Sequence, residues 1–274
     1  MKHFITYAIS IITLLTSCSG REKEAAARLE CAEAFFERNE WLSAKNAIDS
    51  IRADYPDETG ILKEALTLMR QIEMKEAERN IVYCDSLLPI RQAEAAEAVK
   101  DFVFEKDSAY EQTGNYIQYR QTVERNIERS YIRCGVNEQG EMYLTSVYFG
   151  SRPIRHTGIK VSRSDGVFAE TAHIPYDGGL NYRFKDGENI SEIVQYKGEH
   201  GVDVIKFICS NAKERLYVNY TGGEKYGIYI GGSDKQAYIS TYNFAAILSD
   251  IHNLTSERTK AIKKKEYLEG KLNK

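Results

Sequence analysis

The spacing of apolar residues changes twice along this chain of 274 residues, and these changes constrain its fold most strongly. Up to about residue 100, apolar side chains recur every three to four residues, which is the period of amphipathic helices. From Tyr116 to Ile230, short alternating segments follow one another between turn residues. From Ser233 onward the helical period returns. The pattern predicts an α+β protein in which long helices flank a strand-rich region.

The first helical region is predicted to be a hairpin followed by a long helix. Residues 21–60 carry two apolar faces separated by Arg38–Glu40. Tyr55-Pro56 ends the second helix, because the residue before a proline is pushed out of the α region. Residues 57–88 have the three-four spacing of a coiled-coil edge, and Pro89 is expected to close that helix. The alanine- and glutamate-rich stretch that follows is also predicted to be helical.

The hairpin resembles a single tetratricopeptide repeat. The residues that carry this resemblance are Ala34, Phe35, Trp41, Ala44, Ile48, Ile51 and Pro56. Asn39 stands where that repeat has its turn glycine, and asparagine tolerates the left-handed conformation. Because repeat arrays need about three units for stability, no superhelical peptide groove follows from one unit. Two helices packed through ordinary apolar faces explain the same residues.

The middle region is predicted to form an antiparallel sheet structure that begins near Phe102–Phe104. The expected strands are Tyr131–Val136, Met142–Phe149, Gly158–Ser162, Val167–Thr171, Asn181–Phe184, Ile190–Tyr196, Val202–Cys209, Arg215–Tyr220 and Tyr226–Ile230. Hairpin turns are expected at residues 137–140, 164–166, 185–187 and 221–223, which all contain glycine. No connection is long enough for a parallel crossover helix. We therefore expect an antiparallel β-sandwich or a partly open barrel.

The C-terminal part is predicted to be one long helix that packs back on the N-terminal helices. Ser233 and Gln236 have the spacing of a capping box, and the apolar face continues to about Leu268. The predicted division of the chain is a signal segment at 1–17, a helical region at 18–100, a β domain at 101–232 and the closing helix at 233–274.

The first residues have the pattern of a secretory signal. Lys2 is followed by an apolar run from Phe4 to Leu15, and then by Thr16-Ser17-Cys18. The apolar run is shorter than the roughly 20 residues that span a bilayer. A small-residue exit directly before a cysteine resembles the lipobox of bacterial lipoproteins. That resemblance implies cleavage before Cys18 and acylation of its thiol and new amino group. An uncleaved anchor, or an ordinary signal peptide with a free thiol at Cys18, are the alternatives.

The lipobox and the order of helices and strands together resemble uncharacterised outer-membrane lipoproteins of Bacteroidota. This resemblance implies a lipid-anchored envelope protein, and Ser19 after the cysteine favours the outer membrane; the membrane face stays open. No activity comes with it. Exported proteins of that phylum are O-glycosylated at short Asp-Ser or Asp-Thr motifs, which Ser50, Ser86 and Ser108 match here. Matches of three residues are common by chance.

Charge and cysteine content give further limits. The chain has 37 Lys+Arg against 40 Asp+Glu, with both signs interspersed, which argues against a nucleic-acid-binding protein. Four thiols remain besides Cys18, at Cys31, Cys84, Cys134 and Cys209. Export permits disulfides, and Cys134 and Cys209 could meet across a core, but buried free thiols explain them equally well. We assign no bridge.

No catalytic, metal-binding or cofactor-binding motif is present. The sequence has no GxSxG, HExxH or GxxxxGK[ST] pattern. His156, His173 and His200 lack metal-ligand spacing and are interpreted as turn or surface residues. Two hypotheses follow. The first is a non-catalytic envelope lipoprotein that binds a protein or glycan partner through its β domain. The second is an envelope hydrolase whose acidic or His/Asp site is assembled by folding, which requires a concave pocket where such residues converge.

Overall fold

The computed structural model describes residues 2–106 and 113–273, with side chains described from residue 20 onward. The chain divides into two compact units, which we call unit 1 (residues 1–86 and 256–274) and unit 2 (residues 87–255). The fold is α+β, with two antiparallel sheets and a long C-terminal helix that packs on the N-terminal helices, as the sequence predicts. Helices α3 (Thr59–Ala98) and α5 (Gly232–Leu272) each contribute a segment to both units.

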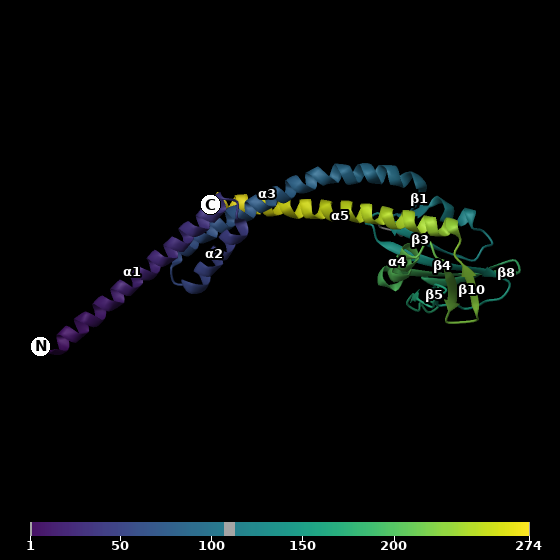
Figure 1. Cartoon of the computed structure of the whole chain (residues 1–274), viewed down its shortest axis with the longest axis horizontal. Coiled ribbons are helices and arrows are strands. Elements are labelled where there is room, and N and C mark those ends of the chain that lie inside the picture. The colour runs from purple at the N-terminus through teal and green to yellow at the C-terminus, as the bar shows by residue number, and fades with distance from the viewer. Residues whose placement is uncertain (1, 107–112, 274) are drawn as a thin grey trace. The chain divides into compact units, whose positions relative to one another are not determined.

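In unit 1, α1 (Lys2–Glu37) and α2 (Trp41–Asp54) form the predicted hairpin (Figure 1). Asn39 adopts a φ of 60°, so the chain reverses through the left-handed conformation that asparagine tolerates. Tyr55 ends α2, as the following proline predicts. The core consists of Ala25, Leu29, Ala32, Ala44, Ile48, Ile51, Tyr55, Ala65, Leu68 and Ile72. Ala34, one of the residues that resemble the repeat, is exposed.

The last turns of α5 lie against the first part of α3 within unit 1. Ala261 and Leu268 are buried, and Lys265 forms an ion pair of 3.2 Å with Glu78. Lys264 lies 3.7 Å from Glu73. The apolar seam of α5 therefore meets that of α3, with charged pairs along its edges. Over the described residues, no helix has the length and apolarity needed to cross a bilayer.

The expected end of α3 at Pro89 is wrong, because the helix continues through the proline to Ala98. Proline removes one backbone hydrogen bond and crowds the preceding turn. On either side of it the helix is held by tertiary contacts, since Cys84 is buried and Ala95 and Ala98 pack on the core of unit 2. The 3-10 turn η1 (Val99–Asp101) then leads into the first strand.

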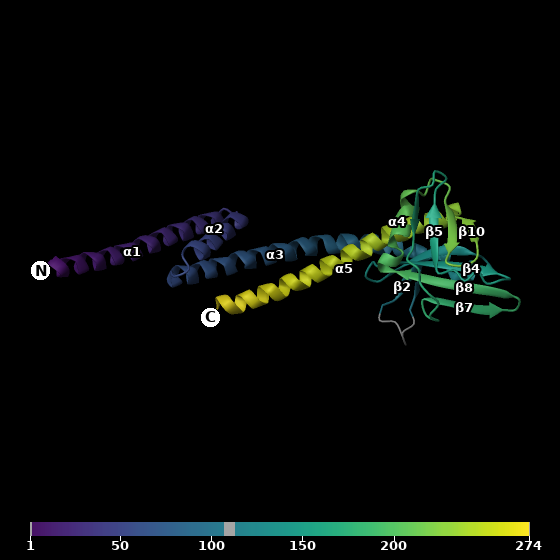
Figure 2. The same cartoon turned by 90° about the horizontal axis from the view of Figure 1, so that it is seen from below.

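The described residues of unit 2 form two antiparallel sheets, and strands of both are labelled in Figure 2. The larger has the order β1-β2-β3-β4-β8-β7, with β1 Phe102–Glu105, β2 Asn115–Gln118, β3 Tyr131–Asn137, β4 Met142–Gly150, β7 Asn181–Asp186 and β8 Asn189–Lys197. The smaller has the order β10-β9-β5-β6, with β5 Gly158–Ser162, β6 Phe168–Glu170, β9 Tyr217–Thr221 and β10 Tyr226–Tyr229. Strand β2 is absent from the predicted strands.

The segment predicted as strand Val202–Cys209 is wrong, because it forms helix α4 (Val202–Ser210). A short, continuous apolar run fits a buried strand and a buried helix equally well. Val204, Ile205 and Ile208 lie on one helical face and are fully buried in the core, while Asp203 sits favourably in the first turn. Cys209 is accordingly in a helix and only half-buried.

The predicted glycine turns are present. Gly140, Gly166, Gly187 and Gly222 have φ values of 84°, 88°, 58° and 93°, which L-residues rarely adopt. These turns fix the register of the strands that they connect. The 3-10 turns η2 (Tyr119–Gln121) and η3 (Val123–Arg125) bridge β2 and β3, and η4 (Gly198–His200) precedes α4.

Alternation along the strands gives the six-stranded sheet two different faces. The inner face carries Ile132, Cys134, Leu144 and Val194, which pack in the core with the smaller sheet, α4 and α5. The opposite side, which we call the outer face, carries the intervening residues of β3, β4, β8 and β7. Both faces hold candidate functional groups.

Candidate functional site

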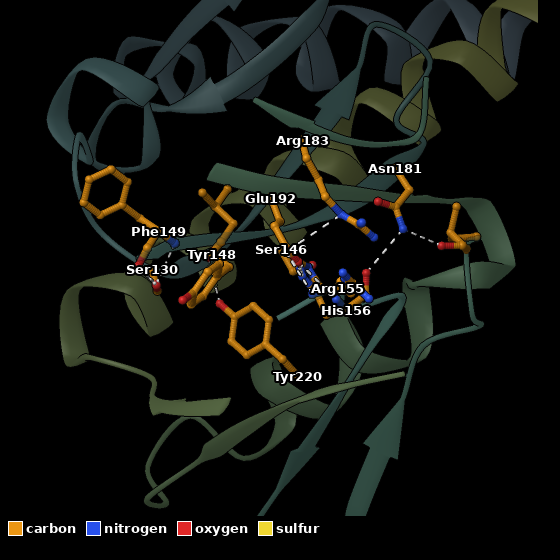
Figure 3. Close-up of polar contacts among 12 residues, drawn as sticks. Ser130, Ser146, Tyr148, Phe149, Arg155, His156, Asn181, Arg183, Glu192 and Tyr220 are labelled. Carbon is orange, nitrogen blue, oxygen red and sulfur yellow. Dashed lines mark hydrogen bonds and ion pairs between the residues drawn. The ribbon is translucent and has the colours of Figure 1, made fainter. Parts of the chain in front are cut away.

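A chain of polar side chains is enclosed on the inner face of the six-stranded sheet (Figure 3). Nδ1 of His156 lies 3.0 Å from Oε2 of Glu192, and Nε2 of His156 lies 2.8 Å from Oγ of Ser146. The Ser146 hydroxyl also lies 3.1 Å from the hydroxyl of Tyr196. Ser146 comes from β4, Glu192 and Tyr196 come from β8, and His156 comes from the loop between β4 and β5. All four are fully buried.

The Glu192 carboxylate is held by backbone donors as well as by the imidazole. Oε1 accepts a hydrogen bond of 2.8 Å from the N–H of Arg155, and Oε2 accepts one of 3.1 Å from the N–H of His156. Arg155 has a φ of 56°, and this left-handed conformation turns two successive N–H groups toward one anion. Burial alone raises the pKa of Glu192, but these hydrogen bonds and that from the His156 ring outweigh it and lower the pKa.

The interpretation of His156 as a turn or surface residue is wrong, since its side chain is fully buried. His173 and His200 are exposed, as expected. Nothing in the local sequence distinguishes His156 from the other two. Its partners lie 10 and 36 positions away and meet it only through the pairing of β4 with β8.

The order serine, histidine, carboxylate is that of a hydrolytic triad, in which histidine takes the serine proton and the carboxylate orients the ring. Here the serine hydroxyl has no exposed surface. Three surface cavities of the described chain, of about 780, 460 and 270 Å³, have none of these residues in their walls. An acyl substrate could reach Ser146 only if the two sheets separated.

The outer face of the six-stranded sheet carries a pocket of about 270 Å³, which we call the outer-face pocket. It lies over β3, β4, β8 and β7, with residues 123–129 at its side. Its apolar wall includes Val123, Ile127, Val147, Phe149, Phe184 and Ile193. Phe184 is 50% exposed and Tyr182, which also lines the pocket, is 38% exposed, so two aromatic rings remain accessible on β7.

Two polar atoms in the wall of this pocket lack hydrogen-bond partners among the described residues. They are Nη1 of Arg133 and Oγ1 of Thr145, and both atoms are buried. Arg133 and Thr145 face each other across β3 and β4 in the sheet register. Thr145 is only 3% exposed, so bulk water does not satisfy its hydroxyl. Buried polar groups are usually paired, and two unpaired ones in one wall mark the place where a ligand could bind.

The neighbouring Arg129 behaves differently. Its guanidinium donates a hydrogen bond of 2.7 Å to Oδ1 of Asn126 and forms an ion pair with Asp234 at the start of α5. Glu128 and Asp186 also line the pocket, and both are exposed. Arg133, in contrast, forms no ion pair within the described part of the chain. The uncommitted positive charge of the pocket is therefore that of Arg133.

The remaining predicted site residues lie apart from both features. Cys18 falls within α1, where its side chain is not described. Ser50 and Ser86 lie in α2 and α3, and their hydroxyls donate to the carbonyls of Ala47 and Tyr83. Ser108 lies outside the described residues. Oligosaccharide attachment at any of the three stays a prediction.

The four cysteines with described side chains, Cys31, Cys84, Cys134 and Cys209, are free thiols. Burial raises the pKa of Cys209 to about 11 and that of Cys134 further, so neither has the thiolate character of a nucleophile. No group of three or more His, Cys, Asp or Glu side chains within the described ranges is arranged to hold a metal ion.

Comparisons with models of protein families, with curated proteins and with solved structures find no match.

Proposed function

We propose that this protein is a non-catalytic, lipid-anchored envelope protein that binds a partner through the outer face of its six-stranded sheet. One observation carries the proposal. The buried serine, histidine and carboxylate that could perform hydrolysis are enclosed between the sheets, whereas the outer-face pocket is lined by apolar, aromatic and unpaired polar groups. No histidine or cysteine is among the pocket's described lining residues. Such a surface suits binding better than acid–base chemistry.

The competing function, an envelope hydrolase, would use Ser146, His156 and Glu192. Their geometry satisfies the nucleophile–base–carboxylate order, but it lacks the reachable reaction centre that such a mechanism requires. Ser146 is also engaged with Tyr196, which completes a buried network that ties β4 to β8. Networks of this kind specify a unique core when every member is satisfied. We therefore assign the four residues a structural role.

The proposed partner is an envelope protein or glycan that presents an apolar group. Aromatic rings with half-exposed faces provide a large contact area at little entropic cost. Phe184 and Tyr182 are such rings, and they lie on β7, the edge strand of the six-stranded sheet. An edge strand also offers unpaired backbone groups to a partner.

Photo-crosslinking in the native envelope tests this surface. With a photoreactive phenylalanine analogue in place of Phe184, we expect one adduct of defined mass. The same analogue at Tyr229, which is 55% exposed on the smaller sheet, serves as the matched control and should give no such adduct. Ile193→Lys, on the neighbouring strand of the pocket, should abolish the adduct at position 184. Equal adducts at both positions would refute the proposed surface.

The anchor is proposed to be an acylated Cys18. Several acyl chains, at roughly 0.8 kcal/mol for each buried methylene, hold a protein at a membrane durably. We expect metabolic labelling with an alkyne fatty acid to be lost in Cys18→Ala, and the protein to leave the outer-membrane fraction. Cys31→Ala, which removes an exposed thiol from the same helix, should keep full labelling. Unchanged labelling of the Cys18 variant would exclude the lipid anchor at this residue.

A further inference from the structure

We infer that the outer-face pocket binds a small carboxylate, that is, one acid group on an apolar or aromatic body. The inference rests on the proposed binding role of this face and adds the chemical class of the ligand. It starts from the two unpaired polar atoms, Arg133 Nη1 and Thr145 Oγ1, which belong to paired positions on adjacent strands. A guanidinium N–H and a threonine O–H are both donors. The group that satisfies both is an oxygen acceptor.

A negative charge on that acceptor is favoured by Arg133. Hydrogen bonds between ionised partners are about twice as strong as neutral ones. Arg133 is half-buried, and its long side chain can turn the guanidinium toward an oxygen in the pocket. The other arginine of the wall, Arg129, is already committed to Asp234 and Asn126. A ligand anion therefore has one free guanidinium available, and not two.

We expect the ligand to carry a single negative charge. Glu128 and Asp186 lie in the wall as well, and each disfavours a second negative charge nearby. A phosphate monoester carries a charge of about −1.5 to −2 at neutral pH, which is poorly matched to a wall that offers one free arginine and two carboxylates. A carboxylate carries one charge and offers two oxygens, one for Arg133 and one for Thr145. The arrangement thus distinguishes a carboxylate from a phosphate.

The size and the apolar wall define the rest of the ligand. A volume of about 270 Å³ corresponds to about nine water molecules at about 30 Å³ each. It lies just below the usual range for drug-sized ligands, about 300–1,000 Å³. Val147, Phe149 and Ile193 are half-buried apolar residues of its wall, and Phe184, which also lines it, is half-exposed. A short alkyl or phenyl-alkyl acid fills such a space and leaves its acid group beside Arg133.

The test compares 3-phenylpropionate with its neutral counterpart, 3-phenyl-1-propanol, which has the same apolar body. Binding is measured by protein-observed NMR titration at pH 7. The protein is the full chain with Cys18→Ala, which changes no residue of the pocket. We expect the acid to bind at least about tenfold more tightly than the alcohol, as one hydrogen bond to a charged group predicts. Equal affinities for the two probes would overturn the carboxylate assignment.

Two variants and a control distinguish the contribution of the ligand's acid group to binding from that of its apolar body. Arg133→Met should remove the preference for the acid and leave the weaker binding of the alcohol unchanged. Thr145→Val should reduce the preference roughly threefold while the protein keeps or gains thermal stability, because it replaces an unpaired buried hydroxyl with a methyl group. Arg215→Met, an exposed arginine before β9, is the matched control and should change nothing. A purely structural role for Thr145 predicts lower stability and an unchanged preference.

The outcomes also separate this inference from the proposed function. Phe184→Ala should weaken acid and alcohol alike, because it removes apolar wall only. If neither probe binds while the crosslink at position 184 is formed, the carboxylate inference is wrong and the binding surface stands. If the probes bind as expected but the crosslink is absent, the pocket takes a small acid and the macromolecular partner is refuted. Retention of the acid preference in Arg133→Met overturns the role given to that residue.

Discussion

Replacing Glu192 by alanine is expected to lower the free energy of unfolding of unit 2 by about 3–5 kcal/mol. The substitution leaves three donors in the core without their acceptor, namely the backbone N–H groups of Arg155 and His156 and the His156 ring. It also opens a cavity between β8 and the loop that precedes β5. Each unpaired buried group costs about 1–3 kcal/mol, so this single carboxylate holds that loop in place.

Hydrogen exchange of the β4 and β8 amides is the suitable measurement, because the only tryptophan, Trp41, lies in unit 1. Tryptophan fluorescence then serves as the internal control and should keep its urea midpoint. Ser146→Ala removes the partner of His156 Nε2 and one partner of the Tyr196 hydroxyl, but Glu192 and both backbone donors stay paired. Its cost should therefore be smaller, at about 1–3 kcal/mol. A loss of the same size in the two variants would argue against the carboxylate as the centre of the network.

The same carboxylate gives unit 2 a defined pH dependence. The pKa of Glu192 in the folded protein lies below its ordinary value of 4.5. The folded state therefore binds the proton less readily than the unfolded state, and the stabilisation is present above pH 4.5. It is lost as the pH falls through the folded pKa. In Glu192→Gln the stability of unit 2 should fall less steeply over this acid range than in the unaltered protein.

Much of the architecture follows from local pattern. Helices end at Asn39 and Tyr55, and turns occur at Gly140 and Gly187. These features depend on the backbone conformation of single residues, which the residue type and its neighbour indicate. Two of the errors in element assignment, at Pro89 and at α4, arise where tertiary packing decides. The helix continues through Pro89 because tertiary contacts stabilise it before and after the proline. The apolar run at α4 is helical because one face of that helix packs in the core.

The candidate sites could not be predicted in the same way. His156, Glu192 and Ser146 are separated by up to 46 positions in the sequence and meet through strand pairing alone. Thr145 and Arg133 look like ordinary outward-facing strand residues, and only the absence of a partner in the folded chain distinguishes them. A strand pattern specifies which residues share a face, but it does not specify which polar atoms on that face stay unsatisfied.

Gly140→Ala is expected to be the second strongly destabilising change, at roughly 2–5 kcal/mol. Its φ of 84° costs an L-residue about 1–2 kcal/mol. The added Cβ would also lie 2.4 Å from the backbone nitrogen of Ser249 and 2.6 Å from the carbonyl oxygen of Ala245, both in α5. The backbone of a helix cannot move aside as the end of a flexible side chain can. The β3–β4 turn would therefore have to move away from α5.

Gly166→Ala is the matched control, because Gly166 has a φ of 88° and its added Cβ would meet no atom within 4 Å. It carries the conformational cost alone, so the difference between the two variants measures the contact of the turn with α5. Chemical denaturation followed by far-ultraviolet circular dichroism, with hydrogen exchange of the β3 and β4 amides, supplies both values. If the two variants lose the same stability, the turn does not pack on α5, and this helix does not support the two strands that carry Arg133 and Thr145.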